Sequence, residues 1–135
     1  IMTFGRDFAY IGNQYHLEIF GEELFPDLLF LNRELNCMVV VELKKGAFKP
    51  AYIGQLQTYM KVLDDKVRKP HENPTIGILL CKSANKAFVE YVIRDYNHPM
   101  GVATYKTAED MSEELRNALP DMDEMRKLLT DDEDV

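Results

Sequence analysis

Short apolar runs separated by turn-forming residues cover most of the chain, and they predict a β-sheet with helices packed against it. Runs rich in Val, Leu, Ile and Phe are typical of strands. We expect five strands, over residues 8–19, 23–31, 37–44, 75–81 and 102–105. The fourth of these is almost continuously apolar, which indicates that both of its faces are buried.

A helical pattern lies between the third and fourth strands. Pro50 stands where a first helical turn would begin, and apolar residues then recur every three or four positions to about residue 68. The side chains expected to pack on the sheet are Ile53, Leu56, Met60, Leu63 and Val67.

The order of these elements predicts an α/β domain with a mixed sheet. The first three strands should form an antiparallel meander, with Gly12 as a bulge and residues 32–36 as a turn. A strand, helix, strand unit forms a crossover, so the fourth strand should run parallel to the third. Ser83 is expected to cap a second helix that ends near Asp95.

One domain accounts for most of the 135 residues. We expect it over residues 1–118, followed over residues 119–135 by a C-terminal helix and a disordered acidic tail. Short helices are expected at residues 108–119 and 120–130. Because the chain begins with Ile1 and not Met, we expect it to be a fragment of a longer protein with a further N-terminal domain.

Three charged side chains interrupt the apolar strands. Asp27 stands within a run of Phe and Leu, and Glu42 and Lys44 follow the run that begins at Cys37. An ionised group in a low-dielectric setting must be paired, hydrogen-bonded or bound to a metal. We therefore interpret these three residues as the candidate site.

Strand geometry predicts that these side chains lie together. Successive residues point to opposite faces of a strand, so Glu42 and Lys44 share one face. Asp27 can lie level with Glu42 on the adjoining strand, where paired Cβ atoms are roughly 5 Å apart. Two carboxylates at that separation can both stay ionised if a hard divalent cation lies between them, and oxygen ligands favour Mg²⁺ or Mn²⁺.

The spacing of these residues resembles that of a known family. Pro26-Asp27, fourteen further residues and Glu42-Leu43-Lys44 resemble the PD-(D/E)xK signature of metal-dependent nucleases. A wider frame, over about residues 4–105, is similar to the C-terminal nuclease domain of the YhcG-type family of predicted PD-(D/E)xK nucleases. The segments that carry this resemblance are Phe8 to Tyr15, Asp27 to Phe30, Val41 to Lys44, Gly54 to Leu56, Glu72 to Gly77 and Cys81-Lys82.

The resemblance implies a restriction-endonuclease-like core and a Mg²⁺-dependent endonuclease that hydrolyses phosphodiester bonds in DNA, leaving a 5′-phosphate. It implies that Asp27, Glu42 and the backbone carbonyl of Leu43 hold the metal. Lys44 would position the attacking water or neutralise developing negative charge, and Gln55 would orient the water or the phosphate.

Charge is distributed unevenly along the chain, whose net charge is −7. Residues 1–105 carry 12 basic and 12 acidic side chains, whereas residues 106–135 carry 4 and 11. Residues 42–70 carry 7 basic against 3 acidic side chains. We interpret this excess as a phosphate-steering rim, with an ordinary solvated helix face as the alternative. Its members would be Lys45, Lys49, Lys61, Lys66, Arg68 and Lys69.

Several classes of function find no support in the sequence. No apolar run approaches the roughly 20 residues of a membrane span. The chain has no glycine-rich phosphate loop, and its three histidines lack zinc-ligand spacing. Cys37 and Cys81 are expected to be reduced core thiols, as in a cytoplasmic protein.

Alternatives to DNA cleavage remain open on the sequence. One is a catalytically silent nucleic-acid-binding or assembly module, and another is an RNA-directed nuclease. The clustering of Asp27, Glu42, Lys44 and Gln55 argues against the silent module, because a domain free of catalysis has no need for that costly set. Glu18 is a further candidate metal ligand, with an ordinary exposed strand acid as its alternative. DNA is the expected partner, while RNA binding and a homodimer are left open.

Overall fold

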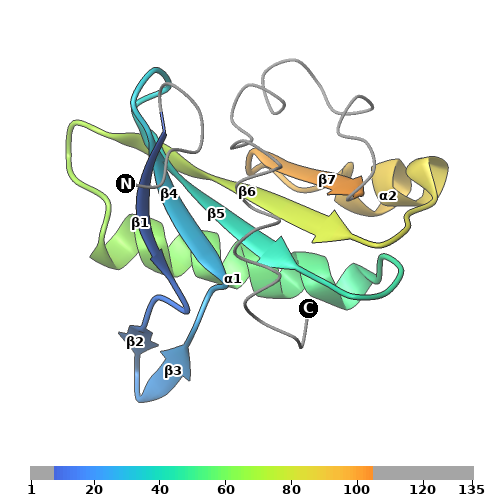
Figure 1. Ribbon diagram of the computed structural model, residues 1–135, viewed down its shortest axis with the longest axis horizontal. Helices are drawn as coiled ribbons and strands as arrows, with labels where there is room; N and C mark the ends of the chain where they lie inside the picture. The colour runs from blue at the N-terminus through green and yellow to red at the C-terminus, as the bar shows by residue number, and fades with distance from the viewer. Residues whose placement is uncertain (1–7, 105–135) are drawn as a thin grey trace.

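The computed structural model describes residues 8–104, which form a mixed sheet flanked by helices (Figure 1). Its elements, in chain order, are β1 (Phe8–Asn13), β2 (Leu17–Ile19), β3 (Glu22–Leu24), β4 (Leu28–Asn32), β5 (Cys37–Leu43), α1 (Pro50–Lys66), β6 (Asn73–Cys81), α2 (Lys86–Ile93) and β7 (Met100–Thr104). The sheet has the order β1-β4-β5-β6-β7, and β2 and β3 form a separate pair. β1, β4 and β5 are antiparallel, whereas β5, β6 and β7 are parallel. The predicted α/β class, meander and parallel crossover are confirmed.

The prediction of two long strands in the N-terminal part of the chain is wrong. The segment 8–19 is divided because β1 ends at Asn13 and Gln14 takes a left-handed backbone conformation, with φ of 49°. The segment 23–31 is divided into β3 and β4 by an irregular stretch that contains Pro26, which has no N–H for a ladder. The predicted bulge is present, since the β1–β4 register shifts between Tyr10 and Gly12.

The turn between β4 and β5 fixes the register on which the site depends. Asn32 Oδ1 accepts a hydrogen bond from the backbone N–H of Leu35 at 2.9 Å. Asn36 then adopts φ of 52°, a left-handed conformation that asparagine tolerates better than most residues. The resulting pairing sets Leu28 opposite Val41. Asp27 directly precedes Leu28 and Glu42 directly follows Val41, so Asp27 is level with Glu42.

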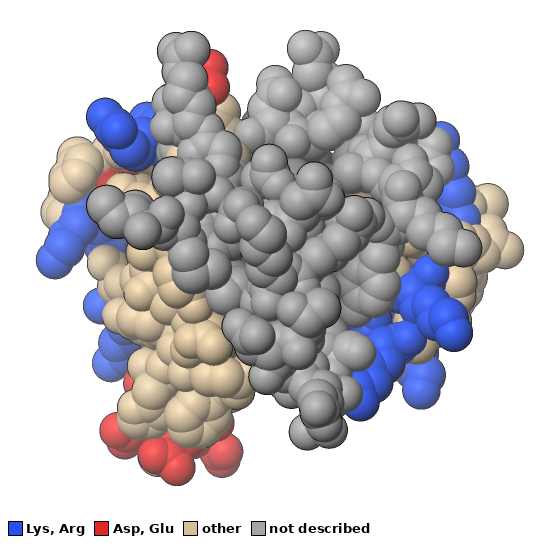
Figure 2. Space-filling view, in the orientation of Figure 1, with Lys and Arg blue, Asp and Glu red and all other residues tan. Residues whose placement is uncertain are grey.

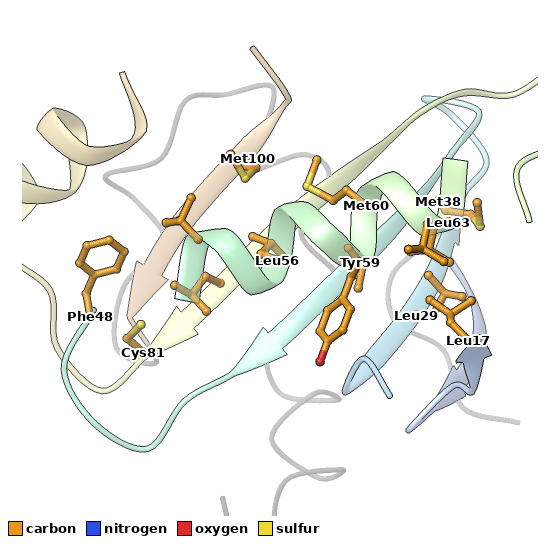
Figure 3. Packing of buried hydrophobic residues seen from close by; sticks show 14 of the residues in the cluster. Leu17, Leu29, Met38, Phe48, Leu56, Tyr59, Met60, Leu63, Cys81 and Met100 are labelled. Atoms are coloured by element: carbon orange, nitrogen blue, oxygen red, sulfur yellow. The ribbon is translucent and has the colours of Figure 1, made fainter. Parts of the chain in front are cut away.

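The helix α1 covers one face of the sheet through the side chains that its periodicity predicts (Figures 1 and 3). Ile53, Leu56, Met60 and Leu63 are buried against that face, and Val67 is partly buried there. Asp64 ties α1 to β6, because its Oδ1 accepts hydrogen bonds from Thr75 N at 2.9 Å and Thr75 Oγ1 at 2.7 Å. The opposite face of the sheet is also buried, through the residues Leu28, Phe30, Cys37, Val39, Val41, Ile76, Ile78, Leu80 and Ala103.

Gly77 is the point of closest approach between β6 and α1. A Cβ at this position would lie 2.5 Å from Met60 Sδ and 3.0 Å from Leu56 Cγ. We expect Gly77→Ala to lower the free energy of unfolding by about 1–3 kcal/mol, because it overpacks a closed core. Gly54→Ala is the control, since a Cβ there meets nothing within 4 Å and should stabilise α1 by up to about 1 kcal/mol. Denaturant unfolding checks both, and equal stability of the two variants would contradict this account.

Smaller differences concern the caps and ends. The second helix is capped by Asn85, whose Oδ1 accepts from Phe88 N at 3.2 Å, so the prediction of Ser83 as the cap is wrong. Asn85 stands directly before the first helical turn, where such a side chain reaches the free N–H groups. The predicted helices at 108–119 and 120–130 and the acidic tail lie outside the described residues. Within residues 8–104, no helix is long and apolar enough to cross a membrane.

The two cysteines are free and buried, as predicted. Burial raises the thiol pKa of Cys37 to about 11, with smaller contributions from the charges of Glu72 and Asp64. Burial likewise raises the pKa of Cys81 to about 11. Thiols with such pKa values remain protonated and unreactive at neutral pH.

Candidate active site

Asp27 and Glu42 lie side by side where β4 begins and β5 ends. The backbone N–H of Asp27 donates to Glu42 Oε1 at 2.8 Å. In return, the backbone N–H of Leu43 donates to Asp27 Oδ2 at 2.9 Å. These two bonds lie directly beyond the last β4–β5 pair, which is Leu28 with Val41. Each carboxylate is therefore held by the strand that carries the other.

Glu42 is the most deeply buried charged side chain of the candidate site, with 2% of its surface exposed. Burial, and after it the nearby charge of Asp27, raise its pKa from 4.5 to about 8. The carboxyl group of Glu42 thus holds a proton at neutral pH unless a cation compensates its charge.

Gln14 holds Asp27 from the other side, a role that the sequence analysis missed. Its side-chain Nε2 donates to Asp27 Oδ1, and its backbone N–H donates to the Asp27 carbonyl, both at 2.9 Å. The β1–β4 register, which sets Asn13 opposite Leu28, brings Gln14 level with Asp27. Antiparallel pairing of the first two predicted strands could have indicated this contact. The first strand was predicted to run past Gln14 to residue 19, so the contact was not expected.

Lys44 and Gln55 meet on the face of the sheet that α1 covers. Lys44 Nζ donates to Gln55 Oε1 at 2.8 Å and lies 4.7 Å from the centre of the Tyr52 ring. Gln55 Nε2 donates in turn to the hydroxyl oxygen of Tyr59 at 3.1 Å. Tyr52, Gln55 and Tyr59 are three and four residues apart on α1, so they lie along one side of the helix.

The structure does not bring the remaining predicted residues into this cluster. Glu18 is exposed on β2, where it pairs with Glu23. Among residues 8–104, no group of three or more Asp, Glu, His or Cys side chains is placed to hold a metal, so Glu18 adds no third carboxylate. Lys45 and Lys49 are exposed on the connection between β5 and α1.

The chemistry of the two carboxylates fits a hard divalent cation. Each carboxylate oxygen has two acceptor sites, so the hydrogen bonds to Asp27 and Glu42 leave lone pairs for a cation. The N–H and C=O of one strand residue point to the same side, so the Leu43 carbonyl also faces the Asp27 side. Mg²⁺ is commonly bound by one or two carboxylates together with waters and substrate phosphates.

Solved structures of other proteins are similar to this chain in fold. The crystal structure of a repair endonuclease from Pyrococcus abyssi matches 73% of this chain and 38% of that one, with a TM-score of 0.51 and 16% identity. A structure of EndoMS with double-stranded DNA matches 72% of this chain and 36% of that one, with a TM-score of 0.49 and 18% identity. At 16% identity, the likeness to the repair endonuclease shows a shared restriction-endonuclease-like fold.

Sequence comparisons identify the family. The Escherichia coli (strain K12) protein named "Putative nuclease YhcG" is 32% identical over 106 residues, which are 78% of this chain. The match spans only 28% of that protein's length. The family model described as the YhcG PDDEXK nuclease domain matches residues 1–120, and this chain therefore belongs to the YhcG family of PD-(D/E)xK nuclease domains.

Proposed function

We propose that this domain is a metal-dependent endonuclease that hydrolyses phosphodiester bonds in DNA. The observation that carries the proposal is the reciprocal hydrogen bonding of Asp27 and Glu42, which holds two carboxylates together beside Lys44. Burial and the charge of Asp27 raise the pKa of Glu42 to about 8, so the unliganded pair is electrostatically unfavourable in its fully ionised form. A bound cation removes that penalty.

Asp27, Glu42 and the Leu43 carbonyl would hold Mg²⁺ or Mn²⁺ in this proposal. The bound ion would polarise the scissile phosphate and lower the pKa of a coordinated water. Gln14 keeps the Asp27 carboxylate in its orientation through the contact to Oδ1. Lys44, fixed by Gln55 and Tyr52, would place its positive charge where negative charge develops on the phosphate.

Positive charge near the site supports a polyanionic substrate. Figure 2 shows Lys and Arg side chains gathered on the side of the molecule where β5 ends and α1 begins. Two loops meet there, because Phe48 N donates to the Ser83 carbonyl at 2.8 Å and Lys82 N donates to the Gly46 carbonyl at 3.0 Å. We define the basic rim as the exposed lysines of these loops and of the first turn of α2, which are Lys45, Lys49, Lys82 and Lys86.

Four members of the rim predicted from sequence lie away from these two loops. Lys61 and Lys66 lie six and eleven residues beyond Gln55 on α1, and Arg68 and Lys69 lie past its end. At 1.5 Å per residue, Lys66 is about 16 Å along the helix from Gln55. These residues are therefore outside the basic rim as defined by the loops.

Loss of one metal ligand tests the proposed function directly. We expect Mg²⁺ to bind the intact wild-type protein and Asp27→Ala to lose that binding, because one of two carboxylates is gone. Calorimetric titration of Mg²⁺ and Mn²⁺ measures the binding, and cleavage of linear, branched and single-stranded DNA and of RNA measures activity. Wild-type protein that cuts none of these substrates would refute the proposal, and cleavage of RNA alone would favour the RNA-directed alternative.

The basic rim should contribute affinity without sequence preference. Replacing Lys45 or Lys49 with Met should weaken binding to every DNA sequence about equally, because exposed lysines contact phosphates. Each replacement should lower the slope of log affinity against log salt by roughly one. Fluorescence anisotropy over a salt series measures both effects, and a change confined to one DNA sequence would contradict a phosphate contact.

A further inference from the structure

Tyr59 occupies an unusual position for a core aromatic residue. Its side chain is 6% exposed and belongs to the apolar cluster between α1 and the sheet. Figure 3 shows its hydroxyl oxygen pointing away from Leu56 and Met60. The hydroxyl oxygen is the partner of Gln55 Nε2, at 3.1 Å. The ring therefore belongs to the core, whereas the hydroxyl belongs to the candidate active site.

The direction of the hydroxyl proton follows from the chain of hydrogen bonds. A lysine ammonium group only donates, so Lys44 must face the amide oxygen of Gln55. The amide nitrogen of Gln55 then faces Tyr59 and donates to it. Because the Tyr59 oxygen accepts this bond, its own hydrogen points elsewhere. Among the residues that the structure describes, the hydroxyl of Tyr59 makes no other hydrogen bond.

The hydroxyl of Tyr59 keeps its proton at neutral pH and can therefore donate a hydrogen bond. Burial, and after it the charges of Glu42 and Asp27, raise the pKa of Tyr59 to about 12. The group is therefore a neutral donor at working pH, and it lies close enough to both carboxylates to sense their charge. A neutral donor can bind an anion here without adding a buried cation next to Lys44.

We propose that the Tyr59 hydroxyl donates a hydrogen bond to an oxygen of the bound phosphodiester, next to the position served by Lys44. This inference rests on the proposed function and names a substrate contact within it. The Gln55 amide has a double role in this arrangement, because it links Lys44 to Tyr59 and turns the hydroxyl proton outward. Tyr59 would then contact the substrate directly, in addition to its hydrogen bond with Gln55.

Tyr59→Phe tests the contact, because it keeps the buried ring and removes only the hydroxyl. We expect kcat/KM for Mg²⁺-dependent DNA cleavage by the intact protein to fall roughly 10- to 100-fold, the loss that accompanies a hydrogen bond to a charged group. Tyr96→Phe is the matched control, since Tyr96 packs partly buried against the same core cluster, and it should cleave within about twofold of wild type. Thermal unfolding shows whether both variants remain folded.

A double-mutant cycle with Gln55→Ala separates a direct contact from an effect passed through Gln55. DNA affinity measured with Ca²⁺ in place of Mg²⁺ keeps the cycle readable where cleavage is lost. A loss from Tyr59→Phe that persists at least in part in the Gln55→Ala background supports the contact, because the hydroxyl can still donate to the phosphate without Gln55. A loss that disappears in that background overturns it, as does a Tyr59→Phe protein with wild-type kcat/KM, and either result leaves the proposed function standing. Wild-type protein that neither binds nor cuts nucleic acid overturns both.

Discussion

Replacing Lys44 with Met should reduce DNA cleavage by a factor of at least 10² to 10³ while metal binding is retained or tightened. The loss follows because Lys44 is the donor that Gln55 and Tyr52 hold in place beside the two carboxylates. Removing one preorganised donor from a developing anion costs about that factor in other hydrolytic sites. Metal binding should survive because neither carboxylate is altered and a positive charge beside the cation is removed.

The measurements for Lys44→Met are single-turnover cleavage at saturating DNA and calorimetric titration of Mg²⁺. Lys61→Met is the control, because Lys61 is an exposed lysine of α1 that lies outside both the site and the basic rim. It should cleave at the wild-type rate. A Lys44→Met protein that still cuts at that rate would remove Lys44 from the mechanism, and loss of metal binding would show that its role is structural.

The relative placement of Asp27, Glu42 and Lys44 could be predicted from the sequence, because it depends only on strand geometry. Alternation along β5 predicts that Glu42 and Lys44 face the same way, and both lie on the α1 side with Val40. The turn between β4 and β5 predicts the level of Asp27, because the length of a hairpin loop sets its register. These are local rules, so they do not require knowledge of the tertiary structure.

The contacts that sequence reasoning missed depend on backbone turns at residues that do not favour them. Gln14 and Phe20 both adopt left-handed φ values, of 49° and 51°. Glutamine does not signal such a conformation, so the first strand was predicted to continue past Gln14 to residue 19, whereas Phe20 lies between the first two predicted strands. The turn at Gln14 delivers its side chain to Asp27, and the turn at Phe20 closes the β2–β3 pair that carries Glu18 away from the cluster.

Glu42→Gln should stabilise the protein in the absence of metal and make its stability independent of pH over a wide range. Burial first, and then the charge of Asp27, raise the pKa of Glu42 from 4.5 to about 8. Between these values the folded protein holds a proton that the unfolded chain has released. The free energy of unfolding should therefore fall by up to about 1.4 kcal/mol per pH unit as pH rises from 5 to 8. The total loss above pH 8 is on the order of 5 kcal/mol.

Denaturant unfolding in EDTA from pH 5 to pH 9 measures this slope, with Glu90→Gln, a change at an exposed residue of α2, as the control that should follow wild type. Mg²⁺ should restore the stability of wild type at pH 8 and above, because the cation takes the place of the lost proton, and binding at pH 7 should release about one proton. The Glu42→Gln protein should gain nothing from Mg²⁺, since an amide is a poor substitute for a carboxylate ligand.

A wild-type stability curve that stays flat from pH 5 to pH 8 would show that Glu42 is already ionised without metal. The two carboxylates would then need no cation to remain together, and their charges would not require a metal at this site.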